Sequence, residues 1–187
     1  MAKLIVWNLM TLDGYFEGEK PWDLDFHNRA WGPELQALSE EFGKKAEALV
    51  FGRRTYEGMA SYWKTAEPGN ITSYMNALPK LVASRTLTET DWNNSRVTAD
   101  IAGELKRLKA ESSRDLYIFG SADLVDSLLG EKDLIDEIMI CVVPGLLGKG
   151  TPLFKSGRTA DFTLLEARPL SNGSVIVRYA PEAKSEG

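Results

Sequence analysis

Four short apolar runs decide which fold class this sequence can adopt. Each run ends in a turn of small or polar residues. They span residues 3–9, 48–52, 80–85 and 116–120. A continuous apolar run with no polar face is typical of a strand that is covered on both sides. Between the runs apolar residues recur at helical spacing, as at Leu35, Leu38 and Phe42. Strands that alternate with helices predict an α/β fold with a mostly parallel sheet.

The C-terminal part of the chain follows a different pattern. Residues 135–143 predict one more long strand, and residues 162–167 and 174–179 alternate apolar with polar side chains. Asn172-Gly173, between the last two, is a strong signal for a hairpin turn. We therefore expect a single domain over residues 1–180, with helices on both faces of a mixed sheet and an antiparallel C-terminal hairpin. Residues 181–187 are expected to form a polar tail.

Composition excludes several classes of function. Lys and Arg number 22 against 27 Asp and Glu, a net charge of −5, which gives no general attraction to nucleic acid or to an anionic membrane. With one cysteine, Cys141, and one histidine, His27, the chain lacks an internal disulfide and the common metal motifs. We expect no metal site. No apolar window is long enough for a membrane span, so a cytoplasmic protein is expected.

Residues suited to anion binding follow three of the predicted strands. The first group is Arg53, Arg54 and Thr55, the second is Ser84 and Arg85, and the third is Gly120, Ser121, Ala122 and Asp123. Arginine side chains and helix N-termini both bind phosphate, and ligands of open α/β sheets bind at the carboxyl ends of strands. Solvated arginines and ordinary helix capping explain each group separately. Three groups on one sheet edge favour a phosphate-bearing cofactor.

Other motifs of nucleotide and acyl chemistry are absent. Residues 145–151 do not form a P-loop, because Lys149 is followed by Gly150 and Val143 occupies the required upstream glycine position. The sequence has neither a Gly-x-Gly-x-x-Gly fingerprint nor a Gly-x-Ser-x-Gly elbow. The polar and aromatic stretch 17–33 is long for a compact domain, and long ordered loops tend to be functional.

The motifs together resemble the dihydrofolate reductase-like family, and within it stand-alone proteins similar to the reductase domain of bacterial riboflavin biosynthesis. The resemblance is carried by residues 10–15, 51–57, 84–87, 91–94, 119–124 and 144–154. It implies a central sheet of about eight strands with NADPH across its carboxyl edge. It also implies that Arg53, Arg54 and Thr55 meet the cofactor phosphates, that Ser84 and Arg85 hold the 2′-phosphate, and that residues 120–123 cradle the pyrophosphate.

The implied activity is hydride transfer from NADPH to a small planar heterocycle of the pteridine or aminopyrimidine class. Trp7, Phe26 and Trp31 would then line the substrate site. Where classical members of the family place a carboxylate for proton delivery, this sequence has Asp25 and His27, while Asp13 opens the active-site loop. His27 would donate a proton near neutral pH, since its usual pKa is about 6.5, and Asp25 would do so if burial raised its pKa.

Alternatives stay open at this point. Asp25 and His27 are equally well explained as surface groups that orient a lid, which leaves a non-catalytic dimeric nucleotide-binding module as the second reading. A flavin would also fit the anion sites. Residues 17–33 offer Lys20 and Arg29 against four acidic residues, which favours a neutral or cationic substrate. The family resemblance implies a homodimer, for which residues 162–167 and 174–179 are the candidate contact.

Overall fold

The computed structural model describes residues 1–155 and 157–182, and its elements follow the expected alternation of strands and helices. In chain order they are β1 (Leu4–Thr11), β2 (Tyr15–Glu17), α1 (His27–Ala30), α2 (Pro33–Lys45), β3 (Ala46–Gly52), α3 (Arg53–Trp63), α4 (Asn70–Ala77), β4 (Lys80–Ala83), β5 (Ser95–Thr98), α5 (Ile101–Glu111), β6 (Asp115–Phe119), α6 (Ala122–Leu129), β7 (Glu137–Val143), β8 (Thr151–Pro152), β9 (Phe162–Pro169) and β10 (Val175–Pro181).

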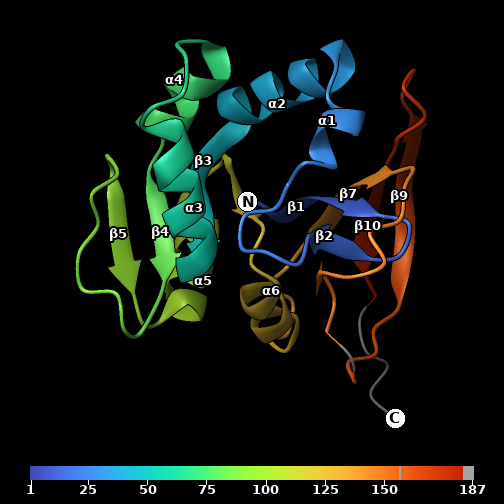
Figure 1. The fold of residues 1–187 in the computed structure, drawn as a ribbon. Coiled ribbons are helices and arrows are strands. Elements are labelled where there is room, and N and C mark those ends of the chain that lie inside the picture. The colour runs from blue at the N-terminus through green and yellow to red at the C-terminus, as the bar shows by residue number, and fades with distance from the viewer. Residues whose placement is uncertain (156, 183–187) are drawn as a thin grey trace.

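The main sheet has eight strands in the order β5-β4-β3-β6-β1-β7-β10-β9, so β5 and β9 form its two edges (Figure 1). The six strands from β5 to β7 run parallel to their neighbours. β10 is antiparallel to both β7 and β9. This confirms the predicted α/β fold, with a mostly parallel sheet and an antiparallel C-terminal hairpin. β2 and β8 pair separately as a small second sheet.

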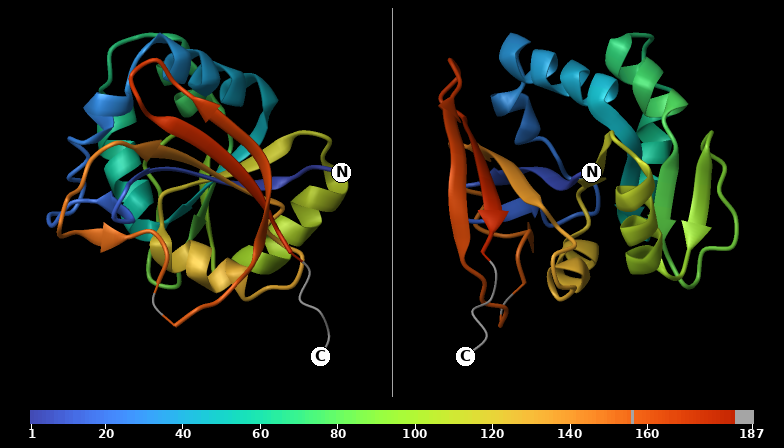
Figure 2. Two further views of the ribbon diagram at one scale, coloured as in Figure 1. Left: turned by 90° about the vertical axis from the view of Figure 1, so that its right-hand side faces the viewer. Right: turned by 180° about the vertical axis from the view of Figure 1, so that it is seen from behind.

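Helices cover both faces of the sheet because each central strand presents apolar side chains alternately to either side. On one face, Trp7 packs with residues of α1, α2, α3 and α4. On the other face, Leu4 and Val6 pack with residues of α5 and α6. Figure 2 shows the two helical layers and the C-terminal hairpin beside them. The fold therefore leaves the carboxyl ends of the central strands as an open edge between the layers.

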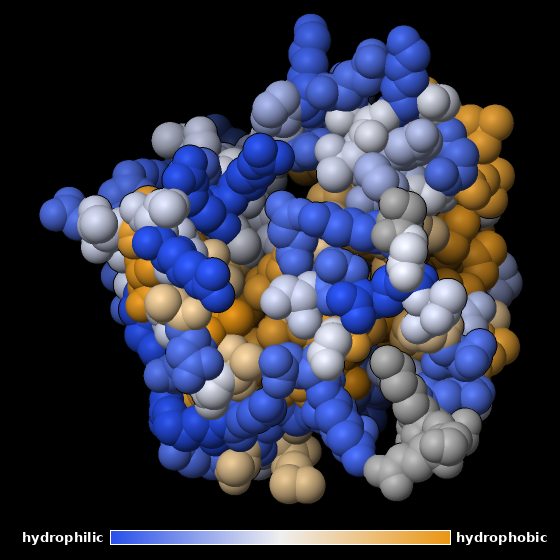
Figure 3. All heavy atoms as spheres, turned by 90° about the horizontal axis from the view of Figure 1, so that it is seen from below, coloured by the Kyte–Doolittle hydropathy of each residue, from blue (hydrophilic) through white to orange (hydrophobic). Residues whose placement is uncertain are grey.

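Apolar surface gathers on the side of the C-terminal hairpin (Figure 3). Leu164 and Leu165 of β9 are 54% and 48% exposed. β9 also carries a register shift opposite Arg178 and Tyr179, which interrupts the ladder at that edge. Within residues 1–155 and 157–182, no helix is long and apolar enough to cross a membrane.

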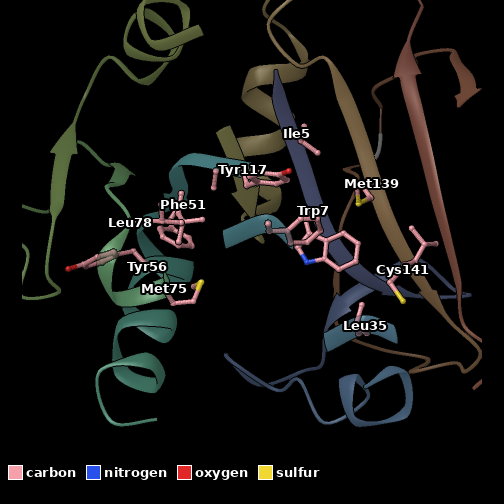
Figure 4. Packing of buried hydrophobic residues seen from close by; sticks show 14 of the residues in the cluster. Ile5, Trp7, Leu35, Phe51, Tyr56, Met75, Leu78, Tyr117, Met139 and Cys141 are labelled. Atoms are coloured by element: carbon pink, nitrogen blue, oxygen red, sulfur yellow. The ribbon is translucent and has the colours of Figure 1, made fainter. Parts of the chain in front are cut away.

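The core beneath the α1–α4 layer is rich in aromatic and sulfur-containing side chains (Figure 4). Trp7 lies edge-on to Phe42 with ring centroids 5.1 Å apart, and Phe42 lies 4.9 Å from Tyr117. Cys141 is buried among these groups, and burial raises the pKa of its thiol to about 11. The cysteine is therefore part of the packing and stays protonated near neutral pH.

Strand ends differ from the sequence prediction where side chains bind the backbone. β4, which the sequence predicts over residues 80–85, stops at Ala83. Ser84 Oγ accepts hydrogen bonds from Thr86 N and Leu87 N, at 3.2 and 2.9 Å, and so forms a turn at this point. The polar tail was expected to begin at Pro181, which instead closes β10. Residues 183–187 of that predicted tail lie outside the described residues.

Candidate active site

A cleft of about 1330 Å³ lies at the carboxyl ends of β1, β3, β4 and β6. One part, which we call the arginine end, is lined by Gly52–Thr55, Ala83–Thr86 and Gly120–Asp123. The other part, which we call the aromatic end, is lined by residues of β1, β2, α1, α2 and α4, of α3 beyond Thr55, and of the segment that joins β2 to α1. Its rings are Trp7, Phe16, Trp22, Trp31, Tyr62, Trp63 and Tyr74. The fold thus brings all three predicted anion-binding groups to one cleft.

Two of the turns at the arginine end are fastened together by Ser121. Its hydroxyl oxygen accepts a hydrogen bond from Gly52 N at 2.7 Å, and the same hydroxyl donates to Thr55 Oγ1 at 2.8 Å. Gly120 and Ser121 both have φ of 62°, in the left-handed region. A Cβ on Gly120 would lie 2.8 Å from the Thr55 side chain, so only glycine fits there.

Arg53 joins the turn after β3 to the turn after β4. Its Nη1 donates to Thr86 Oγ1 at 3.0 Å, and its Nε lies 3.1 Å from Glu57. Arg54 and Arg85 are exposed in the cleft and have no ion pair with any of the described residues. Of the predicted phosphate ligands, Arg53, Thr55 and Ser121 therefore hold the turns in place, whereas Arg54 and Arg85 are free to bind an anion.

The donors at the arginine end fit a group that carries several phosphates. Asn8 accepts a hydrogen bond from Gly120 N at 3.0 Å, while its own buried Nδ2 has no partner in the part of the chain that the structure describes. α6 begins at Ala122 and directs its first N–H groups toward the same turn. The one carboxylate there, Asp123, is paired with Lys155. Unpaired arginines, amide hydrogens and a helix N-terminus together suit the phosphates of a dinucleotide.

Asp13, predicted to be catalytic, is not among the residues that line the cleft. Its carboxylate accepts hydrogen bonds from Thr11 Oγ1 at 2.6 Å, from Leu147 N at 3.1 Å and from Gly148 N at 2.7 Å. These bonds, that from Thr11 above all, lower the pKa of Asp13. The residue fastens the β1–β2 turn to the loop after β7, and the geometry gives it no place in proton transfer.

The two other predicted proton donors also differ from expectation. Asp25 is exposed and does not line the cleft, so it lacks the burial that its predicted role requires. His27 does line the cleft, beside Phe26 with ring centroids 4.6 Å apart. Burial lowers the pKa of His27 to about 4. The imidazole is therefore neutral at pH 7, and the predicted role as an acid near neutrality is not supported.

His27 nevertheless has an unused hydrogen-bonding atom at the cleft. Its Nε2 is buried and has no hydrogen-bond partner within residues 1–155 and 157–182. Of the predicted substrate contacts, Trp7 and Trp31 line the aromatic end, with Trp31 50% exposed. Phe26 does not line the cleft and packs against the core. A ligand at the aromatic end would thus meet a neutral imidazole nitrogen and flat ring surfaces.

Trp22 is a cleft residue that the sequence did not single out as a contact. Its backbone has φ of 66°, and its N–H donates to Glu17 Oε2 at 2.9 Å. Its ring lies directly on the backbone of α3 at Gly58, where a Cβ would come within 2.2 Å of it. Tyr62, Trp63 and Tyr74 were missed as well, because α3 and α4 reach the cleft only through tertiary packing.

Comparisons with known proteins agree with this geometry. Residues 2–176 match the family model described as the RibD C-terminal domain. The Bacillus subtilis protein YyaP is 26% identical over 175 residues, which cover 91% of this chain and 90% of YyaP. A protein of Shewanella sp. PV-4, described as a riboflavin biosynthesis protein, superposes with a TM-score of 0.74 at 25% identity and covers 97% of this chain and 99% of its own.

A more distant structure shares the fold. Dihydrofolate reductase from Enterococcus faecalis, solved in complex with NADP(H) and RAB-propyl, has a TM-score of 0.63 at 15% identity over 96% of both chains. The eight-stranded sheet and its hairpin are thus those of a reductase-type fold. Because the family model covers nearly the whole sequence, the chain belongs to the RibD C-terminal domain family.

Proposed function

We propose that the protein is an NADPH-dependent reductase that transfers hydride to a small planar heterocycle of the pteridine or aminopyrimidine class. The observation that carries this proposal is one cleft with free arginines and a helix N-terminus at one end and aromatic rings at the other. The family and the reductase-type fold point the same way. When bound, the nicotinamide supplies the hydride, and the protein supplies binding and orientation.

Arg54 and Arg85 are proposed to hold the cofactor phosphates, and Arg85 with Ser84 to distinguish NADPH from NADH. Arg85 stands at the turn that the Ser84 hydroxyl closes, so its guanidinium is presented from a fixed backbone. Residues 120–123 are proposed to cradle the pyrophosphate at the start of α6. Ser121, Thr55 and Arg53 hold these turns in register before the cofactor arrives.

At the aromatic end, Trp7 and Trp31 are proposed to flank the planar substrate. The neutral His27 offers Nε2 as a hydrogen-bond partner that orients the ring. Asp13 and Asp25 do not line the cleft. The proton that accompanies the hydride is therefore assigned to water in the open cleft rather than to one of these side chains.

The same observation favours a second candidate, a nucleotide-binding module without hydride transfer. The arginine end would bind the nucleotide in the same way. Asp13 and Asp25 do not line the cleft, and His27, which does, is neutral at pH 7. The two candidates differ in turnover and agree in NADPH binding, so binding and turnover must be measured separately.

The first experiment is thermal unfolding with NADPH, NADH and flavin mononucleotide in parallel. A ligand at about 100 times its Kd stabilises the native state by about 2.7 kcal/mol. A larger shift with NADPH than with NADH is expected. NADPH oxidation with a panel of pteridines and aminopyrimidines then separates the reductase from the binding module. A shift with flavin mononucleotide alone would mean that the cofactor is a flavin rather than NADPH. No shift with any of the three would refute the proposed site.

A homodimer is proposed to form through the hairpin edge. Leu164 and Leu165 are exposed on β9, and apolar surface gathers on that side of the molecule (Figure 3). The contact would cover an edge strand that otherwise presents free backbone groups. Light scattering of the purified protein tests the dimer, and Leu164→Lys should yield a monomer.

A further inference from the structure

One ion pair at the arginine end has no role in the proposed function. Among the described residues, the cations that line the cleft are Arg53, Arg54, Arg85 and Lys155. Lys155 differs from the arginines because it does not belong to the turns after β3, β4 and β6. It follows β8, and its ammonium pairs with Asp123 in the first turn of α6. A cation and an anion therefore face the proposed pyrophosphate site together.

The two charges of this pair act on a bound phosphate in opposite ways. Asp123 is the only carboxylate among the described residues of the arginine end, and it is the second residue of α6. A phosphate held at this helix N-terminus would be repelled by the Asp123 carboxylate. Asp123 also raises the pKa of Lys155, which keeps the ammonium charged. Lys155 thus neutralises the one negative charge that opposes a phosphate here.

A buried amide at the same turn points independently to a ligand. Asn8 of β1 is 6% exposed and lines the cleft. Its Oδ1 accepts a hydrogen bond from Gly120 N at 3.0 Å, and its Nδ2 has no partner within residues 1–155 and 157–182. A buried N–H group without an acceptor is unfavourable. This favours a ligand with acceptor oxygens at the turn where Asp123 begins α6 with Ala122.

Lys155 can change its partner while the backbone stays in place. Two residues before it, Leu153 is fully buried, and its N–H donates to Gly14 O at 3.0 Å. These contacts fix the chain close to Lys155. The side chains of Lys155 and Asp123 are 47% and 78% exposed, so their ion pair is open to solvent and weak. An ammonium on a flexible four-carbon chain can leave such a partner for a more highly charged phosphate group.

We propose that Lys155 binds the pyrophosphate of the cofactor, and that it leaves Asp123 to do so. The inference rests on the proposed function, which assigns the arginine end to a dinucleotide. Asp123 is then the counter-ion of Lys155 in the absence of cofactor, and the carboxylate and the pyrophosphate compete for one ammonium. Because NADPH and NADH share the pyrophosphate, Lys155 should contribute equally to the affinity of both. Arg85, which is proposed to hold the 2′-phosphate, should contribute to that of NADPH alone.

Isothermal titration of the full chain with NADPH and with NADH tests the contact of Lys155. We expect Lys155→Met to weaken the binding of both about tenfold, because one charge-assisted contact to a phosphate is lost. Lys155→Arg retains the cation and should bind like the wild type. Lys149→Met is the matched control, since Lys149 also pairs with a carboxylate, that of Glu19, but does not line the cleft. Wild-type affinity in Lys155→Met, a loss for NADPH alone, or an equal loss in Lys149→Met would overturn the inference.

The competition with Asp123 is tested by its own variant. Asp123→Asn removes the competitor for Lys155, so NADPH and NADH should each bind roughly threefold more tightly, the size expected for an exposed ion pair. Asp91→Asn is the control, because Asp91 is a similarly exposed carboxylate that pairs with Lys64 and does not line the cleft. Its affinities should match those of the wild type. Unchanged or weaker binding in Asp123→Asn would show that no such competition exists.

Inorganic pyrophosphate separates this inference from the proposed function. Thermal unfolding of the wild type and of Lys155→Met is followed with this anion alone. If neither dinucleotide binds but pyrophosphate stabilises the wild type more than Lys155→Met, the proposed function is wrong and the Lys155 site stands. If NADPH binds the wild type while pyrophosphate stabilises both proteins equally, the inference is wrong and the proposed function stands.

Discussion

The hydroxyl of Ser121 lies 2.7 Å from Gly52 N, and through this hydrogen bond the turn after β6 is fastened to the turn after β3. Ser121 makes the bond from a left-handed backbone conformation with φ of 62°. That conformation costs a non-glycine residue roughly 1–2 kcal/mol. The bonds to Gly52 and Thr55, each contributing about 1 kcal/mol, offset this cost. The arginine end is thus organised before any ligand binds.

Removal of the Ser121 hydroxyl should therefore destabilise the protein. We expect Ser121→Ala to lower the free energy of unfolding by about 1–3 kcal/mol, because Gly52 N loses its acceptor while the backbone strain remains. Urea denaturation measures the change. Ser121→Gly is the control, since it lacks the hydroxyl but adopts the left-handed conformation without strain, and it should lose less stability than the alanine variant. An alanine variant as stable as the wild type would show that this contact contributes nothing.

Arg85 should determine the preference for NADPH over NADH. Its guanidinium has no ion pair among the described residues, so alanine at this position removes a ligand contact without breaking an internal one. We expect Arg85→Ala to weaken NADPH binding at least tenfold and to leave NADH binding nearly unchanged, because charge-assisted contacts to the extra phosphate are lost. Isothermal titration with both cofactors measures the ratio.

Arg29→Ala serves as the control for Arg85→Ala. Arg29 is likewise exposed, but it does not line the cleft, and its removal changes the net charge by the same amount. It should leave both cofactor affinities unaltered. A similar loss of NADPH affinity in the two variants would assign the effect to overall charge rather than to a phosphate contact.

His27 should make stability depend on pH between about 4 and 6.5. Burial holds its pKa in the native state at about 4, whereas the unfolded chain has a pKa near 6.5, so the unfolded state binds more protons in this interval. The contribution of the neutral imidazole is fully present above pH 6.5 and is lost as pH falls through 4. Between pH 7 and pH 5 we expect a loss of about 2 kcal/mol.

The variant His27→Gln isolates this contribution, because His27 is the chain's single histidine. Its free energy of unfolding should change less between pH 7 and pH 5 than that of the wild type. An equal pH dependence in the two proteins would mean that the imidazole is not buried in the native state.

The sequence predicted the central strands because they are covered on both faces and read as unbroken apolar runs. It did not predict β5 (Ser95–Thr98), an edge strand with one partner, or the short helix α4 (Asn70–Ala77). The burial of Lys80 is a further feature that the sequence pattern does not predict. This residue opens β4 yet is fully buried, and its ammonium donates to the carbonyls of Asn76, Leu78 and Asn93. Acceptors supplied by the fold cannot be seen in a sequence pattern.

In the candidate site, too, the sequence predicted some features and not others. The carboxyl ends of parallel strands share one edge of a sheet, so the sequence could predict that the arginines meet there. It could not distinguish Arg53, which is bound to Thr86 and Glu57, from the free Arg54 beside it. The role predicted for His27 used the usual pKa of a solvated imidazole, whereas burial lowers the pKa of this imidazole to about 4.

The contact between Trp22 and α3 gives the last prediction. Gly58 lies inside α3, where alanine ordinarily stabilises a helix by about 1 kcal/mol. Here a Cβ would come within 2.2 Å of the Trp22 ring, so the ring must leave its place at the cleft. We expect Gly58→Ala to destabilise the protein and to shift the tryptophan emission. Gly69→Ala, with no atom within 4 Å of the new Cβ, should leave the emission unchanged. An unaltered spectrum and greater stability in Gly58→Ala would refute the position of Trp22 over α3.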